Sequence, residues 1–208
     1  MPPAMSGARN RMSAILAGVL GLGYIIGVTV YLVSWIRRAA RVLDSALTPL
    51  GLTSQPYMVV GRRYRGMIEG RAIEVQFLPA YGFTRALLNL TIGANLRTRM
   101  AIGRRIPWLD CGDCARLDTS GLGLKDLCVV AEDGERARSL LVDPEVSAVL
   151  VRLLLDRGSE TREVYVQPDR VWMRVRFRGR MAEAVAHWLD DLRNLAHAGE
   201  CVFARSSQ

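Results

Sequence analysis

The chain has 208 residues and a mass of 23.1 kDa, enough for one sizeable domain and too short for most multidomain enzymes. Half of the residues are apolar and 23% are charged, a composition that excludes a disordered chain. The net charge is +8, and the excess lies nearer the N-terminus: residues 36–110 hold 12 arginines against 4 acidic residues, whereas residues 111–208 hold 14 basic residues against 16 acidic ones.

Residues 12–36 are predicted to form one transmembrane helix. These 25 residues carry no charge, and a helix of that length rises about 37 Å, more than the hydrocarbon core of about 30 Å. A cleaved signal peptide is the alternative, but its apolar run spans only about 7–15 residues and precedes a small-residue cleavage site. Here the run ends at Arg37, with Tyr31 and Trp35 placed as interfacial aromatic residues. We expect a retained single-pass anchor.

Charged residues at the two ends of this helix indicate its orientation. Arg9 and Arg11 precede it, and Arg37, Arg38 and Arg41 follow it, so the positive-inside rule favours a cytoplasmic C-terminal domain by about one charge. The arginines that follow the helix also suit the anionic inner leaflet. We expect a location in the inner, cytoplasmic membrane.

Small residues within the predicted helix suggest that it packs against another helix. Gly18, Gly21, Gly23 and Gly27 recur at spacings that allow close backbone approach, including a G-x-x-x-G pair. Chance is the alternative, because glycine is common in such helices. The expected partner is a transmembrane subunit or a second copy of the chain.

Residues 37–54 have an amphipathic pattern, which fits either a short interfacial helix or a continuation of the transmembrane helix. Pro49 and Gly51 are predicted to end it. The expected organisation is therefore a tail at 1–11, a transmembrane helix at 12–36, a juxtamembrane amphipathic segment at 37–54 and a soluble domain at 55–208.

The soluble domain is predicted to start with strands and to mix strands with helices later. Alternating apolar residues indicate a hairpin at 64–68 and 72–78 with a tight turn at Glu69-Gly70. An antiparallel meander at 86–92 and 96–102 and a connection at 103–126 are predicted to follow. Later elements are a strand at 127–131, helices at 133–141, 145–156 and 181–198, and a hairpin at 163–167 and 171–177. The predicted fold class is α+β: one N-terminal transmembrane helix and a soluble domain of antiparallel strands packed with helices.

A resemblance to known proteins lies in residues 55–200. The strand pair with Tyr64-Arg65-Gly66 and Gly70-Arg71, then Val129-Val130-Ala131 leading to Asp133 and Pro144, resembles membrane-anchored bacterial families of unknown function. The resemblance implies a fold and a membrane setting, and it transfers no catalytic residue.

Two cysteines form the sharpest local motif. The C-x-x-C of Cys111 and Cys114 could hold one zinc ion or close a small disulfide, or both could be ordinary cysteines. No second C-x-x-C or H-x-x-x-H pair completes a zinc site, so we expect no cofactor, with zinc as the alternative.

A second candidate lies on the strand at 170–178, which places Arg170, Arg174, Arg176 and Arg178 on one face with Trp172. Such a face is either the solvated side of a sheet or a surface that binds protein, anionic lipid or, least favoured, nucleic acid.

We expect a non-catalytic protein, since neither a Ser/His/Asp assembly nor a nucleotide-binding loop is predicted. The favoured role is an accessory, assembly or scaffold subunit of a larger membrane complex, such as a respiratory or photosynthetic one. The alternatives are a membrane-bound thiol or metal protein and a module that binds anionic lipid or nucleic acid.

Overall fold

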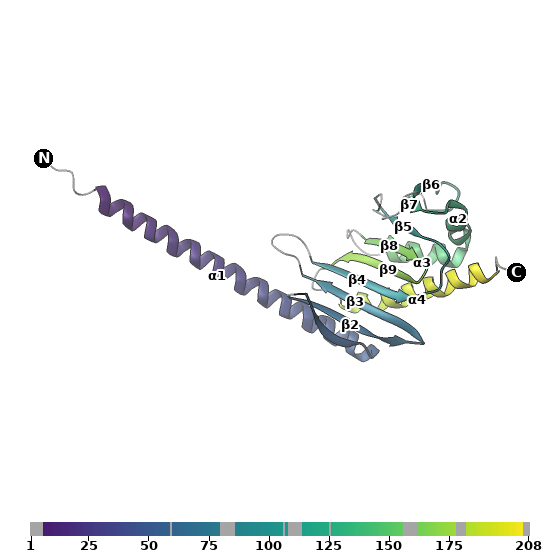
Figure 1. The fold of residues 1–208 in the computed structure, drawn as a ribbon, viewed down its shortest axis with the longest axis horizontal. Helices are drawn as coiled ribbons and strands as arrows, with labels where there is room; N and C mark the ends of the chain where they lie inside the picture. The colour runs from purple at the N-terminus through teal and green to yellow at the C-terminus, as the bar shows by residue number, and fades with distance from the viewer. Residues whose placement is uncertain are drawn as a thin grey trace. The chain divides into compact units, whose positions relative to one another are not determined.

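The computed structural model describes residues 6–58, 60–79, 86–105, 107, 114–124, 126–155, 162–177 and 182–205. The chain forms two compact units, residues 1–41 and residues 42–208. Figure 1 shows the elements in chain order, from the long N-terminal helix through the sheet to the C-terminal helix.

Helix α1 (Ser6–Leu47) is one continuous helix of 42 residues. Of the two readings of residues 37–54, the structure has the continuation, because α1 runs on to Leu47 and is followed by a 3₁₀ turn, η1 (Thr48–Leu50). Gly51 ends that turn with a φ of 78°, a left-handed conformation that favours glycine. Within the described residues, α1 is the one helix long and apolar enough to cross a membrane.

The second unit is built on a nine-stranded antiparallel sheet in the order β1-β2-β3-β4-β9-β8-β5-β7-β6. Its strands are β1 (Thr53–Tyr57), β2 (Gly61–Ile68), β3 (Arg71–Leu78), β4 (Leu87–Gly93), β5 (Met100–Gly103), β6 (Ala115–Leu117), β7 (Cys128–Ala131), β8 (Arg162–Gln167) and β9 (Arg170–Arg176). The predicted tight turn at Glu69-Gly70 is confirmed: both residues have positive φ, 49° and 77°, as a two-residue hairpin loop requires.

The predicted meander is wrong at one step, because β4 and β5 are not neighbours. The β8–β9 hairpin lies between them, so β4 pairs with β9 and β5 pairs with β8. The segment after Gly93 passes the end of that hairpin, where the Ala94 and Leu96 amides donate to the carbonyls of Asp169 and Pro168 at 3.0 and 2.8 Å. The inserted hairpin thus supplies the hydrogen-bond acceptors for the amides of Ala94 and Leu96.

Three helices complete the unit: α2 (Gly134–Val142), α3 (Pro144–Leu154) and α4 (Ala182–Arg205). Asp133 and Asp143 cap α2 and α3, each accepting two amide protons from the first turn, and Pro144 occupies the first helical position of α3. Helix α4 extends to Arg205, beyond the predicted end at 198.

The core lies between these helices and one face of the sheet. Cross-strand pairing aligns a row of apolar side chains over eight strands: Tyr64, Val75, Leu90, Met173, Val164, Ile102, Val129 and Leu117. The first seven are fully buried, and α2, α3, α4 and the last turns of α1, with the buried Leu43 and Leu47, pack on this side. The predicted α+β fold of antiparallel strands packed with helices is confirmed.

Candidate binding face and predicted sites

Among the described residues, no helix packs on the opposite face of the sheet, which carries polar and aromatic side chains. We call it the open face and define it by these residues on β2, β3, β4, β8 and β9: Arg63, Arg65, Glu74, Gln76, Asn89, Thr91, Glu163, Tyr165, Trp172, Arg174 and Arg176. The pairing register arranges most of them in two rows. One holds Arg63, Gln76, Asn89, Arg174 and Glu163, and the other holds Arg65, Glu74, Thr91, Trp172 and Tyr165.

On the β2–β3 side of the open face, the positive charges are neutralised internally. Glu74 accepts a hydrogen bond from Arg65 Nε at 2.6 Å, lies 3.3 Å from Arg63 Nε and also accepts from Gln76. Burial acts to raise the pKa of Glu74, but these hydrogen bonds and the two arginines outweigh it and hold that pKa below its usual range. The Arg63 guanidinium also lies over the Tyr57 ring at 3.9 Å.

On the β8–β9 side, two aromatic rings form a rigid platform. Tyr165 and Trp172 are stacked with centroids 3.9 Å apart and planes within 5°. The Tyr165 hydroxyl donates to Glu163 at 2.8 Å; burial and that carboxylate raise the pKa of Tyr165. The Arg174 guanidinium lies 5.2 Å from the Trp172 ring centre and 6.0 Å from that of Tyr165. Because the two ring centres are only 3.9 Å apart, these distances place the cation beside the stacked pair.

Two arginines of β9, Arg174 and Arg176, differ from Arg63 and Arg65 of β2 because no described carboxylate forms an ion pair with them, whereas Arg170 on the same strand lies 3.7 Å from Asp169 Oδ1. Glu163 faces Arg174 in the register, yet its carboxylate is engaged by the Tyr165 hydroxyl. Among the residues that the structure describes, neither Arg174 nor Arg176 forms an ion pair, and both are exposed. The predicted alternation of this strand is confirmed from Arg170 to Phe177, whereas Arg178 lies outside the described residues.

The sites predicted near the membrane lie on α1. Arg37, Arg38 and Arg41 are exposed, and a Cβ added at Gly18, Gly21, Gly23 or Gly27 would meet no atom within 4 Å. Both sets are therefore accessible along the helix. A helix–helix contact there and a lipid contact of the arginines stay predictions.

The cysteine motif is described only in part. Cys114 is disulfide-bonded, Cys128 and Cys201 are free thiols, and Cys111 lies outside the described residues. In the described part of the chain, no group of three His, Cys, Asp or Glu side chains gathers as a metal site would require. Zinc binding by Cys111 and Cys114 stays a prediction.

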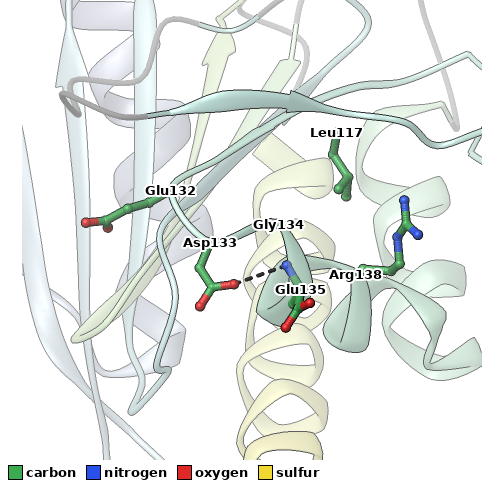
Figure 2. Close-up of a pocket in the computed structure, with 6 residues that line it drawn as sticks. All are labelled: Leu117, Glu132, Asp133, Gly134, Glu135 and Arg138. Carbon is green, nitrogen blue, oxygen red and sulfur yellow. Dashed lines mark hydrogen bonds between the residues drawn. The ribbon is translucent and has the colours of Figure 1, made fainter.

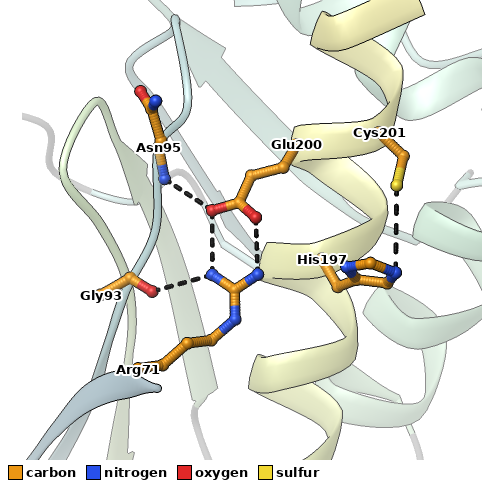
Figure 3. A network of polar contacts seen from close by, with 6 residues as sticks. All are labelled: Arg71, Gly93, Asn95, His197, Glu200 and Cys201. Carbon is orange, nitrogen blue, oxygen red and sulfur yellow. Dashed lines mark hydrogen bonds and ion pairs between the residues drawn. The ribbon is translucent and has the colours of Figure 1, made fainter. Parts of the chain in front are cut away.

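One polar network joins segments that the sequence gives no reason to connect. Glu200 on α4 binds Arg71 on β3 through two hydrogen bonds of 2.9 and 2.5 Å and accepts a third from the Asn95 amide at 2.8 Å, as Figure 3 shows. Arg71 also donates to the Gly93 carbonyl. The hydrogen bond from Arg71 has the largest effect on the pKa of Glu200. Together with the Asn95 amide and the positive charge of Arg71, it holds that pKa below its usual range. No sequence pattern could reveal a pair 129 positions apart.

An open depression of about 630 Å³ lies at the start of α2, between Leu117 on β6 and Arg138 (Figure 2). The first-turn amides of α2 would suit an anion, but the Asp133 carboxylate already accepts from two of them, at 3.1 and 3.0 Å. Glu132 and Glu135 add further negative charge at its rim. The depression is therefore not an anion site.

Comparison with known protein families, curated proteins and solved structures found no match. The resemblance to membrane-anchored bacterial families stays an expectation.

Proposed function

We propose that this chain is a single-pass membrane protein that serves as an accessory, assembly or scaffold subunit of a larger membrane complex, such as a respiratory or photosynthetic one. Its contribution is binding rather than catalysis. The observation that carries the proposal is the one-sided sheet: the described helices cover one face, and the other presents arginines and the half-buried Trp172 ring, which is stacked on the buried Tyr165. Arginine, tyrosine and tryptophan are the residues enriched where proteins bind each other.

The anchor supports the same role. Helix α1 is exposed and apolar over the segment from Val19 to Tyr31, a surface that suits lipid or neighbouring transmembrane helices. A subunit tethered in this way needs only modest affinity at the open face, because the anchor raises the effective concentration of its partner.

A bulky residue at the centre of the open face tests the proposal. Thr91 lies between Glu74 and Trp172, so Thr91→Trp should obstruct a docked partner while leaving the core side of β4 untouched. Ser139→Trp on the exposed surface of α2 is the matched control. Both variants and the wild type would be purified from native membranes in mild detergent, and the co-purifying proteins quantified.

A stoichiometric partner should accompany the wild type and Ser139→Trp, and its recovery should fall at least about fivefold with Thr91→Trp, since one well-packed interface residue is worth upwards of about 1 kcal/mol. Recovery of the chain alone from every preparation would contradict the accessory role. Equal recovery with both tryptophan variants would place the contact elsewhere.

The orientation of the domain is proposed from charge, with the C-terminal domain on the cytoplasmic side of the inner membrane. The disulfide at Cys114 favours placement outside the cytoplasm, because stable disulfides are typical of oxidising compartments. Protease treatment of intact cells and of inverted vesicles decides whether the C-terminal domain lies on the cytoplasmic or on the outer side of the membrane. Degradation only in inverted vesicles supports the cytoplasmic placement.

A further inference from the structure

We infer that the open face recognises an acidic protein segment, and that Arg174 and Arg176 of β9 are the residues that bind its carboxylates. This inference rests on the proposed function and names the chemistry of the partner. It starts from the distribution of charge on the face. Arg63 and Arg65 share Glu74, and Arg170 lies 3.7 Å from Asp169 Oδ1, whereas Arg174 and Arg176 form no ion pair with a described residue.

The two guanidinium groups are arranged to bind a pair of anions. Arg174 and Arg176 are two residues apart on one strand, so their side chains leave the same face about 7 Å apart. Carboxylates at positions i and i+2 of an extended segment, or at i and i+4 of a helix, have a similar spacing. The Arg174 guanidinium lies beside the Tyr165–Trp172 stack, 5.2 Å from the Trp172 ring centre, and this contact limits the side-chain entropy lost on binding.

The centre of the face is polar. Asn89 is the cross-strand neighbour of Arg174, and its side chain is half-buried on the open face. Mixed amide, aromatic and arginine side chains are typical of protein interfaces.

Two other polyanions fit these observations less well. A nucleic acid strand would need free ring faces for its bases, but Tyr165 is only 3% exposed and covers one face of Trp172 at 3.9 Å. An anionic lipid surface would press phosphates against the carboxylates of Glu74 and Glu163 on the same face. An acidic protein segment can place its carboxylates opposite Arg174 and Arg176 and away from Glu74 and Glu163.

The test uses the full chain in dodecyl maltoside and a labelled poly-L-glutamate of about 20 residues, with binding followed by fluorescence anisotropy. Arg174→Gln/Arg176→Gln removes two charges from the open face. Arg138→Gln/Arg205→Gln removes two exposed charges from α2 and α4 and is the matched control. Unlabelled oligo-dT of the same length and dodecyl maltoside micelles containing phosphatidylglycerol serve as competitors.

The face variant should bind poly-L-glutamate at least about tenfold more weakly than the wild type, and the control should change less than about twofold, because only charge-assisted contacts at the site are lost. Arg176→Gln alone should weaken binding about threefold or more. Since Arg176 has no described ion pair, this single variant keeps the test valid if the double variant unfolds.

Equal weakening by both double variants would overturn the inference in favour of general charge attraction. Displacement of the peptide by oligo-dT or by phosphatidylglycerol micelles at lower concentrations than by unlabelled peptide would overturn it in favour of nucleic acid or lipid. The proposed function fails separately: a chain that binds poly-L-glutamate through β9 yet co-purifies with nothing would keep the acidic specificity and lose the accessory role. A partner whose recovery is unchanged by Arg174→Gln/Arg176→Gln would keep the accessory role and overturn the acidic specificity of the open face.

Discussion

The Arg71–Glu200 pair is expected to hold the C-terminal half of α4 against the sheet, and Glu200→Gln tests this. The side chains are 20% and 27% exposed, and the carboxylate has three hydrogen bonds, two from Arg71. A hydrogen bond to a charged group contributes about 1.5–3 kcal/mol when buried, and partial exposure reduces this. We expect Glu200→Gln to lower the free energy of unfolding by about 2 kcal/mol.

That loss corresponds to a fall in Tm of about 4–8 °C for a unit of this size. Tryptophan fluorescence of the full chain in detergent would follow unfolding, because Trp172 and Trp188 lie in the second unit. Arg205→Gln is the control: Arg205 is 72% exposed and lies 3.9 Å from Asp143, so its loss should change Tm little. A double-mutant cycle with Arg71→Gln isolates the pairwise energy.

The pH dependence of the same pair has a definite sign. The pKa of Glu200 is lowered in the folded chain, so its stabilisation is present above the ordinary carboxyl pKa of about 4.3 and is lost as the pH falls through the lower, folded value. The difference in Tm between wild type and Glu200→Gln should be constant near neutrality and narrow in acid. A difference that persists unchanged at a pH well below 4, or a coupling energy below about 0.5 kcal/mol, would refute an ionic role.

Four further outcomes are expected. Asp133→Ala should lower the free energy of unfolding by about 1 kcal/mol in thermal scans, because two amides at the start of α2 lose their acceptor. Gly61→Ala should cost about 1–3 kcal/mol in the same scans, since the added Cβ would lie 2.7 Å from two backbone oxygens. Gly23→Leu/Gly27→Leu should leave membrane insertion intact and reduce partner recovery in mild detergent; equal recovery would show that these glycines are incidental. The purified domain should retain its fold, judged by circular dichroism, when Cys114→Ser removes the disulfide; unfolding would reveal a structural bridge or metal site.

Sequence periodicity predicted the parts of the fold whose pattern is local. The alternation from Arg170 to Phe177 shows directly in the exposed and buried positions of β9, and the Glu69-Gly70 turn joins β2 to β3 as expected. Both rest on neighbours in sequence, where side-chain direction follows from a two-residue repeat. The faces of single strands could therefore be assigned without a structure.

Strand order and short edge strands could not be predicted in this way. The insertion of the β8–β9 hairpin between β4 and β5 depends on residues some 70 positions downstream, which periodicity within β4 cannot report. Strands β1 and β6 lie at the two sheet edges, and most of their residues are exposed, so they lack the alternating apolar pattern that reveals a strand. Pro56 in β1 further disguises it, although an edge strand tolerates proline.

The candidate site shows the same division between local and long-range information. The sequence predicted that Arg174 and Arg176 share a face with Trp172. It could not show that the Tyr165 ring would stack on Trp172 while its hydroxyl donates a hydrogen bond to Glu163. That arrangement decides the chemistry of the face. A solvated sheet surface would be expected to pair Glu163 with Arg174 directly across β8 and β9, as Glu74 pairs with Arg65 across β2 and β3. Because the Glu163 carboxylate accepts from the Tyr165 hydroxyl and forms no described ion pair with Arg174, the guanidinium groups of Arg174 and Arg176 stay available to the carboxylates of a partner.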